Sequence, residues 1–254
     1  MKNRSTYQKA KVVAFYAGQR KLQKAERLIF SDIDEVLKDA WVLDIGVGTG
    51  RTSHHLIPRC KKYIGIDFSQ AMIDECETQF ADKQAEFHCM DARDLSRFEN
   101  GRFDVIIFSF NGIDCLDYDD RKRVFDEVKR IGKSRGHFIF STHNIGYISS
   151  MYSYQWPKNP LNVLPELRRL RLIKQHNGSL SEFKGKQWAY VKDGAEDFGT
   201  ELVYIDPILQ RTTLREMGFN EIRLFDYRSG KELTDDNINS HTLPWVYFHA
   251  RLPV

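Results

Sequence analysis

The stretch Asp44-Ile45-Gly46-Val47-Gly48-Thr49-Gly50 decides how this chain folds, because its glycines directly follow a short apolar run. Residues 41–46 are typical of a buried strand, and residues 51–56 of the start of a helix. Glycines permit a tight turn and let a ligand touch the backbone, and the free N–H groups of the helix favour a negative group. The spacing G-x-G-x-G differs from the G-x-G-x-x-G of dinucleotide sites, which disfavours a pyrophosphate. The alternative interpretation is a plain strand-to-helix turn.

Strands and helices alternate along the chain around this turn. Such alternation is typical of a parallel, doubly wound α/β sheet that binds ligands at the carboxyl ends of its strands. The final helix–strand–strand segment predicts that the sheet closes with an antiparallel pair. Strands are expected over residues 41–46, 63–67, 85–90, 103–110, 137–142, 200–205, 220–227 and 245–251, with a turn over 132–136, and helices over 7–38, 51–56, 70–80, 118–131, 164–175 and 207–217.

Acidic residues follow the next two predicted strands. Asp67 ends the second strand, where a carboxylate can accept hydrogen bonds from a ribose diol. Asp91 and Ala92 follow the third strand, where the carboxylate can accept from an adenine amino group and the Ala92 N–H can donate to the ring. Asp67 would otherwise cap a helix, and Asp91 would otherwise belong to a turn. Three such features on successive strands favour a nucleoside site.

Together with Gly65-Ile66-Asp67-Phe68-Ser69 and Met90-Asp91-Ala92, the glycine turn resembles the motifs of class I S-adenosylmethionine-dependent methyltransferases. The resemblance covers roughly residues 40–142. It implies a Rossmann-like sheet of seven strands, mostly parallel with an antiparallel last strand, with helices on both faces and S-adenosylmethionine as the cofactor. It also implies that Gly46 and Gly48 line the methionine part of the cofactor and that Asp67 holds the ribose. Phe68 and Met72 would then pack on the adenine, and Asp91 and Ala92 would read its edge. The other residues expected to bind the cofactor are Asp44, Gly50 and Phe108.

Methyl transfer requires the acceptor and the methyl group to be held in line with water excluded, and a base only when the acceptor is protonated. His143 follows the fifth strand and can act as that base. Asn111 and Asp114 follow the fourth strand and can position the acceptor, although a capped turn explains them equally well. Tyr16 can close over the methyl group from the N-terminal helix; otherwise it belongs to the core. The fourth-strand segment lacks the N-P-P-[YF] motif of amino-methylating nucleic-acid enzymes and the acidic pattern of metal-dependent catechol methylation.

Two segments outside the motifs complete the expected single domain of residues 1–254. Residues 1–38 are expected to form a helical cap, and the aromatic insertion 145–198 a lid or substrate-binding element. The alternative role for the insertion is packing or dimerisation, so the protein could form a homodimer. Its basic helix, 164–175, is expected to bury Leu170, Leu172 and Ile173 and to expose its arginines.

The composition narrows the functional classes. Lys plus Arg number 38 and Asp plus Glu 35, so the net charge is +3, too small to indicate a nucleic-acid partner. No apolar run is long enough to span a membrane, and the four cysteines lack metal-ligand spacing, so we expect no metal and a cytoplasmic protein. We expect methyl transfer to an oxygen or nitrogen of a small molecule such as a sugar, a peptide-like compound or another metabolite. The alternatives are an RNA or protein methyltransferase, a non-catalytic S-adenosylmethionine-binding regulator and, more remotely, a nicotinamide-dependent oxidoreductase.

Overall fold

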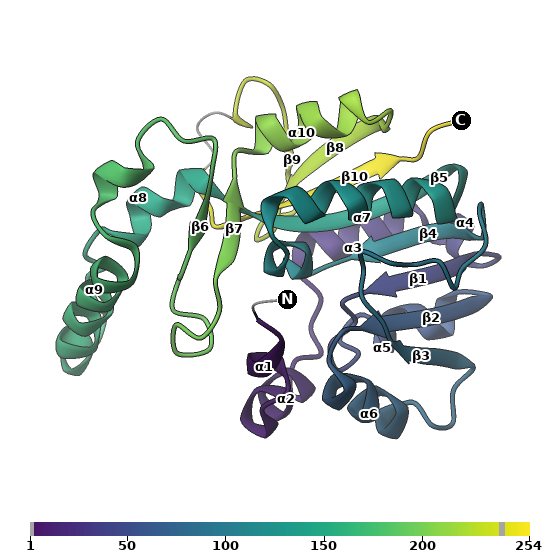
Figure 1. The fold of residues 1–254 in the computed structure, drawn as a ribbon, viewed down its shortest axis with the longest axis horizontal. Coiled ribbons are helices and arrows are strands. Elements are labelled where there is room, and N and C mark those ends of the chain that lie inside the picture. The colour runs from purple at the N-terminus through teal and green to yellow at the C-terminus, as the bar shows by residue number, and fades with distance from the viewer. Residues whose placement is uncertain (1–2, 239–241) are drawn as a thin grey trace.

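The predicted parallel sheet forms the centre of the molecule (Figure 1), a computed structural model that describes residues 3–238 and 242–254. Seven of its strands follow the order β3-β2-β1-β4-β5-β10-β8, and among these seven only β10 runs opposite to the other six. This core confirms the expected class and the antiparallel closing strand. The strands are β1 (Trp41–Ile45), β2 (Lys62–Asp67), β3 (Ala85–Cys89), β4 (Phe103–Phe108), β5 (Gly132–Asn144), β8 (Asn220–Asp226) and β10 (Trp245–Arg251).

Within the described residues, the sheet has ten strands rather than seven. β6 (Trp188–Val191) pairs with β7 (Leu202–Ile205), and β9 (Glu232–Leu233) pairs with β8. β7 also lies parallel to the end of β5, where His143 is opposite Tyr204. The reason is that β5 extends past its last partner on β4, which leaves one edge of residues 143–144 open for β7.

β5 is also longer than the sequence predicts, because residues 132–136 are part of the strand and not a separate turn. The pairing with β4 shifts register between Phe103 and Val105, and Arg135 adopts a left-handed conformation with φ of 58°. The extra residues are therefore accommodated as an irregularity in the strand. At the other end, β4 stops at Phe108, two residues short of the prediction.

Helices cover both faces of the sheet, as predicted (Figure 1). Alternate residues of β4 point to opposite faces: Ile106 packs with Val124 and Phe125 of one helix layer, and Ile107 with the apolar residues of the other. α7 (Tyr118–Ile131) and α10 (Pro207–Glu216) lie on the first face, and α3 (Lys24–Asp32), α4 (Asp34–Leu37), α5 (Ser53–Leu56) and α6 (Gln70–Gln79) on the second. Short 3-10 turns occupy Ile57–Arg59 and Gly112–Cys115.

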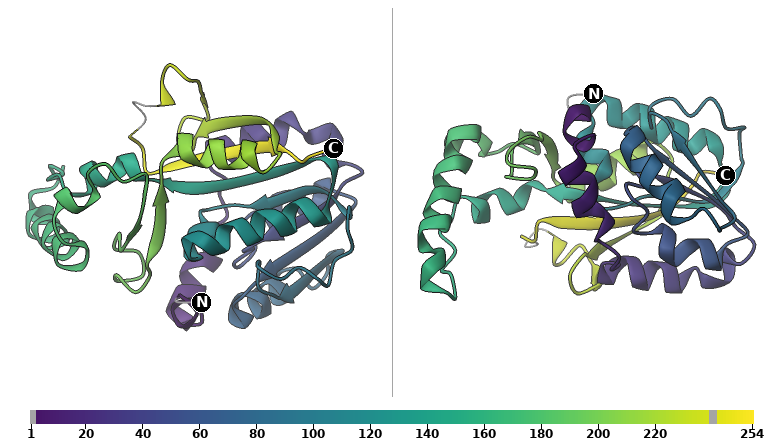
Figure 2. Two further views of the ribbon diagram at one scale, coloured as in Figure 1. Left: turned by 45° about the horizontal axis from the view of Figure 1, so that its top comes forward. Right: turned by 90° about the horizontal axis from the view of Figure 1, so that it is seen from below.

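The predicted helical region 7–38 is divided into four helices. α1 (Arg4–Tyr7) is followed by α2 (Ala10–Ala17), whose C-cap is Gly18, and α3 begins with a capping box between Gln23 and Glu26. α3 and α4 pack on the sheet, whereas α1 and α2 cross the carboxyl edge of the strands (Figure 2). There, Thr6 Oγ1 donates a hydrogen bond of 3.0 Å to the Gly199 carbonyl. Only residues 3–17 therefore lie where a cap over the strand ends would lie.

The insertion 145–198 extends to one side of the sheet (Figure 1) and has a small core of its own, which includes Met151 and Ile173. The basic helix is present as α9 (Val163–Asn177). Its expected buried face is only partly correct: Ile173 is buried, Leu170 and Leu172 are half-buried, and Leu164 is 77% exposed. The remaining elements are α8 (Ile148–Met151) and 3-10 turns at Ile145–Tyr147, Pro160–Asn162 and Leu180–Phe183. Across residues 3–238 and 242–254, no helix combines the length and apolarity needed to cross a bilayer.

A pair of buried histidines lies between β5 and β10. His137 Nδ1 is 2.8 Å from His249 Nε2, and burial lowers the pKa of His249 to about 4 and that of His137 to about 3. Nearby guanidiniums contribute to both pKa shifts, Arg251 to that of His137, and Arg223 and Arg251 to that of His249. A histidine whose pKa is below the unfolded value of about 6.5 contributes stability that is lost as the pH falls from there toward the folded pKa.

We expect the substitution His249→Gln to remove part of this acid sensitivity. Between pH 7 and pH 4.5, the free energy of unfolding of the unchanged protein should fall by about 2 kcal/mol relative to that of the variant. The reason is that only the unchanged protein takes up a proton at residue 249 on unfolding. Urea unfolding at both pH values measures this difference, and the comparison cancels carboxylates common to both proteins. Parallel pH profiles would contradict the prediction.

Candidate active site

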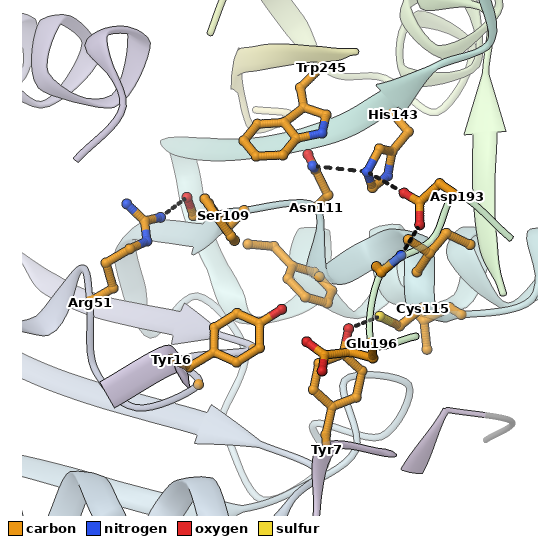
Figure 3. A pocket seen from close by; sticks show the side chains of 18 of the residues that line it. Tyr7, Tyr16, Arg51, Ser109, Asn111, Cys115, His143, Asp193, Glu196 and Trp245 are labelled. Atoms are coloured by element: carbon orange, nitrogen blue, oxygen red, sulfur yellow. Dashed lines mark hydrogen bonds and ion pairs between the residues drawn. The ribbon is translucent and has the colours of Figure 1, made fainter. Parts of the chain in front are cut away.

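A cavity of about 770 Å³ lies at the carboxyl ends of the central strands (Figure 3). Its floor is the glycine turn and the ends of β2, β4 and β5, and its other walls come from α1, α2, the insertion and the start of β10. The segments predicted to carry the cofactor and the chemistry therefore face one shared cavity. Open parallel sheets bind ligands at this edge.

The glycine turn presents its backbone to the cavity at Gly48. This residue has φ of 56°, and a Cβ built on it would meet no atom within 4 Å, so the space above it is open. Gly46 also lines the cavity, beside the Phe108 ring. Gly50 has a different role from the one predicted: it is not among the lining residues, and a Cβ there would collide with Phe80. The first two glycines are thus available to a ligand, and the third is required for packing.

Two buried aspartates flank the turn, and both line the cavity. Asp44 Oδ2 accepts hydrogen bonds from Thr52 Oγ1 and, at 2.6 Å, from the Tyr63 hydroxyl, so this oxygen supports the turn from below. Asp67 accepts from the Gly48 N–H at 3.0 Å and the Ser69 N–H at 2.9 Å, and it lines the cavity. Burial raises the pKa of each carboxyl to about 6.

The end of the cavity next to Asp67 is apolar. Phe68, Met72, Met90 and Ala92 line it. Asp91 does not: its carboxylate is bound by the Arg93 guanidinium at 2.6 Å, and it would have to leave that partner to read an adenine edge.

These residues fit the adenosyl part of S-adenosylmethionine. A buried carboxylate at Asp67 suits a diol, the apolar walls suit a purine, and the open space over Gly48 admits close backbone contact. Of the four apolar residues named above, Phe68, Met72 and Ala92 were predicted from the sequence and Met90 was not.

His143 and Asp114 form a buried hydrogen-bonded pair on the other side of the cavity. His143 Nδ1 lies 2.8 Å from Asp114 Oδ2, and the His143 backbone N–H donates to the same oxygen at 2.7 Å. Asp114 is fully buried, and it also pairs with the Arg121 guanidinium and accepts from Thr142 Oγ1 at 2.6 Å. Because a carboxylate only accepts hydrogen bonds, Nδ1 carries the proton and Nε2 is left as an acceptor.

Asn111 lies next to that acceptor in a strained segment. Its Nδ2 is 3.4 Å from His143 Nε2, and its backbone N–H donates to Ser141 Oγ at 2.8 Å. Phe110 and Asn111 both have positive φ values, 53° and 62°, which non-glycine residues rarely adopt. Such conformations cluster at functional sites, and here they turn the end of β4 toward the end of β5.

Two tyrosines of the N-terminal helices close the cavity from the side of α1 and α2 (Figure 3). The Tyr7 ring is 5.7 Å from Phe68 and 6.1 Å from Tyr16. Burial raises the pKa of the Tyr16 hydroxyl, which therefore stays protonated. Tyr16 thus lies where the sequence predicted a covering residue, and Tyr7 is a neighbour that the sequence analysis missed.

Several other lining residues were not predicted. Arg51 forms a buried ion pair of 2.5 Å with Glu26, which ties α3 to the glycine turn. Asp193 and Glu196 reach the cavity from the loop between β6 and β7, and Trp245 from the start of β10. No local sequence signal marks these positions, because tertiary contacts alone bring them to the cavity.

Fold and cavity together define a Rossmann-like α/β domain whose strand ends carry a cavity with a lining that fits a nucleoside. Residues 42–136 match the family model described as a methyltransferase domain. The chain therefore contains a class I S-adenosylmethionine-dependent methyltransferase domain, which confirms the resemblance and the predicted cofactor.

Curated relatives agree with this class. Ubiquinone biosynthesis O-methyltransferase of Coxiella burnetii is 27% identical over 143 residues, which are 55% of this chain and 59% of that protein. Demethylmenaquinone methyltransferase of Clavibacter sepedonicus is 29% identical over 115 residues, 44% of this chain and 45% of that protein. The matches thus span at most about three fifths of these relatives.

Solved structures share the fold. An S-adenosylmethionine-dependent methyltransferase from Clostridium acetobutylicum superimposes with a TM-score of 0.61 at 18% identity, over 91% of each chain. One from Mesorhizobium loti gives 0.59 at 16% identity, over 89% of this chain and 97% of that one. At these identities the likeness supports the fold.

Proposed function

We propose that the protein transfers a methyl group from S-adenosylmethionine to an oxygen or nitrogen of a small-molecule acceptor. The observation that carries the proposal is the pair His143–Asp114, whose histidine opens onto the same cavity as Gly48 and Asp67. A site that only bound the cofactor would need Gly48 and Asp67, but it would not need a buried imidazole held in one orientation.

Each side of the cavity has a distinct task. When bound, S-adenosylmethionine supplies an electrophilic methyl carbon on a sulfonium. Asp67 would hold its ribose and Gly46 and Gly48 its methionine part, while His143 Nε2 takes the proton of the acceptor and Asp114 stabilises the imidazolium that results. Tyr16 helps to exclude water from this space.

The small-molecule acceptor is supported by the walls around His143. Residues of the insertion and of α1–α2 line this end of the cavity, which suits a compact acceptor better than a polymer. The relative from Coxiella burnetii is by name an O-methyltransferase of ubiquinone biosynthesis, which also favours a small acceptor and an oxygen atom. A cytoplasmic location fits four cysteines that form no disulfide within the described residues. The exposed leucines of α9 are a candidate homodimer surface.

An RNA or protein acceptor has one feature in its favour, the exposed basic residues Arg168, Arg171 and Lys174 of α9. Arg169 of the same helix forms an ion pair of 2.8 Å with Glu166, so its charge is neutralised and is not available to bind an anionic polymer. The small-molecule proposal is therefore preferred.

Transfer of a labelled methyl group tests these alternatives. The protein is incubated with cell extract and methyl-labelled S-adenosylmethionine, and the products are separated into small molecules, protein and RNA. We expect label in the small-molecule fraction, with none when heat-inactivated protein is used. Label confined to RNA or protein would overturn the proposed acceptor, and calorimetric cofactor binding without any transfer would indicate a binding protein.

A further inference from the structure

We propose that the acceptor carries a protonated amine, which Asp193 and Glu196 hold at the end of the cavity that contains His143. This inference rests on the proposed function and names its acceptor class. It concerns recognition of the acceptor and leaves the methylated atom open.

The charges that line the cavity favour a cation. Arg51 and Arg169 are its lining guanidiniums, and each is neutralised by a carboxylate, Glu26 at 2.5 Å and Glu166 at 2.8 Å. Asp193 and Glu196 have no such partner: within the described part of the chain, neither forms an ion pair with a lysine or arginine. The acceptor end of the cavity is therefore anionic, although the whole chain has a net charge of +3.

The Asp193 carboxylate is fixed at its position. Oδ1 accepts from the Ala195 N–H at 2.9 Å, and Oδ2 accepts from the Tyr204 hydroxyl at 3.0 Å. Oδ2 also lies 3.8 Å from His143 Nε2, the acceptor nitrogen of the candidate base (Figure 3). A carboxylate oxygen can accept further hydrogen bonds, so an ammonium group could donate to Asp193 beside the imidazole.

Glu196 comes from a turn that separates it from its acidic neighbour. Residues 196–198 have consecutive φ values of 50°, 57° and 61°. Glu196 lines the cavity beside Tyr7 and Tyr16 (Figure 3), whereas Asp197 is directed outward to an exposed ion pair of 2.8 Å with Lys11. The two acidic residues thus offer a matched comparison within one turn.

A second, independent observation points to a ligand at the same place. Asn111 is 4% exposed and lines the cavity, and its Oδ1 has no hydrogen-bond partner in the part of the chain that the structure describes. Its Nδ2 and Asp193 Oδ2 lie 3.4 Å and 3.8 Å from the same nitrogen, His143 Nε2. A buried amide oxygen without a partner is unfavourable, and an ammonium donor satisfies it.

The surrounding rings suit the same class of ligand. Trp245 and Tyr16 line this space, and aromatic faces attract organic cations. An acceptor with a carboxylate or phosphate here would instead be repelled by two carboxylates, which carry the same negative charge. The aromatic and anionic walls together therefore favour an amine attached to an apolar skeleton.

Matched sets of probes test the proposal. Each set contains an amine, an alcohol and a carboxylate on one skeleton: phenethyl, indolylethyl and hexyl. Binding to the full chain saturated with S-adenosylhomocysteine is measured by ligand-observed NMR. We expect the amine of at least one set to bind about 10-fold more tightly than its alcohol and carboxylate, the ratio that one added charged hydrogen bond supplies. Equal or tighter binding of the alcohols or carboxylates, or binding by no probe, would overturn the proposal.

Substitutions assign the preference to the two carboxylates. Asp193→Asn combined with Glu196→Gln should abolish it, whereas the control Asp197→Asn should leave it unchanged, since an exposed ion pair contributes little. Loss of S-adenosylmethionine affinity relative to S-adenosylhomocysteine, with amine binding intact, would show that Glu196 faces the cofactor sulfonium and would contradict the proposal. If the cofactor binds and label passes to a neutral small molecule, this inference fails while the proposed function stands.

Discussion

Replacement of His143 by alanine is expected to lower the turnover number by about 100- to 10,000-fold, the range that general bases supply. The affinity for S-adenosylmethionine should change less than about 3-fold, because the residues that would hold the cofactor lie on other strands. The measurement is label transfer to the acceptor fraction, with calorimetry for the cofactor. The reason for the large effect is geometric: the Asp114 bond at 2.8 Å leaves Nε2 of the imidazole as the proton acceptor in the cavity.

Two further variants separate a base from a packing residue. Asp114→Asn should also lower turnover, because an amide can donate to the ring and so favour the wrong tautomer. His55→Ala changes a half-buried histidine that does not line the cavity, and it serves as the matched control. Added imidazole should restore part of the activity of His143→Ala, since it can fill the space left. Unchanged turnover in His143→Ala, with the fold intact by circular dichroism, would exclude the base.

The central sheet and the cofactor end could be predicted because their signals are local. The glycines 46 and 48, Asp67 and the apolar residues after it lie within one strand–turn–helix unit or its neighbour, and parallel strands bring their ends to one edge. His143 and Asp114 were chosen separately, as a base and a positioning residue. Their contact follows from the adjacency of β4 and β5, which the alternation of elements already implied.

The residues at the acceptor end of the cavity could not be predicted from the sequence, and the reasons are physical. Asp193 and Glu196 lie in a part of the insertion without helical or strand periodicity. The direction of Glu196 depends on residues 196–198, which are left-handed although none of them is a glycine. β7 was recognised as a strand, but its place depends on how far β5 extends past β4. Asp91 was interpreted from its position after β3, whereas its partner Arg93 is two residues further on and competes for the carboxylate. The spacing of residues along the sequence does not reveal such competition between side chains for one carboxylate.

Replacement of Asp67 by alanine is expected to weaken binding of S-adenosylmethionine by about 10- to 100-fold. Hydrogen bonds to a charged group contribute about 1.5–3 kcal/mol each, and about 1.4 kcal/mol corresponds to a factor of ten in affinity. Asp67 also fixes the Gly48 N–H at 3.0 Å, so its loss loosens the glycine turn as well. Asp94→Ala is the matched control, because this exposed aspartate likewise accepts a backbone N–H but is not among the residues that line the cavity. Titration calorimetry with each variant measures the effect.

The pH dependence of binding distinguishes the charge of Asp67 from its shape. Burial raises the pKa of this carboxyl to about 6, so it is ionised at pH 8 and mostly protonated at pH 5. A protonated carboxyl accepts hydrogen bonds less well, and the affinity for S-adenosylmethionine should therefore fall as the pH drops through 6. Asp67→Asn keeps the shape without the titration, so its weaker binding should be nearly constant between pH 8 and pH 5. An equal loss of affinity between pH 8 and pH 5 in the Asp67→Asn variant would assign the titration to another group. Unchanged affinity in Asp67→Ala would show that Asp67 does not bind the ribose diol, the contact on which the cofactor site depends.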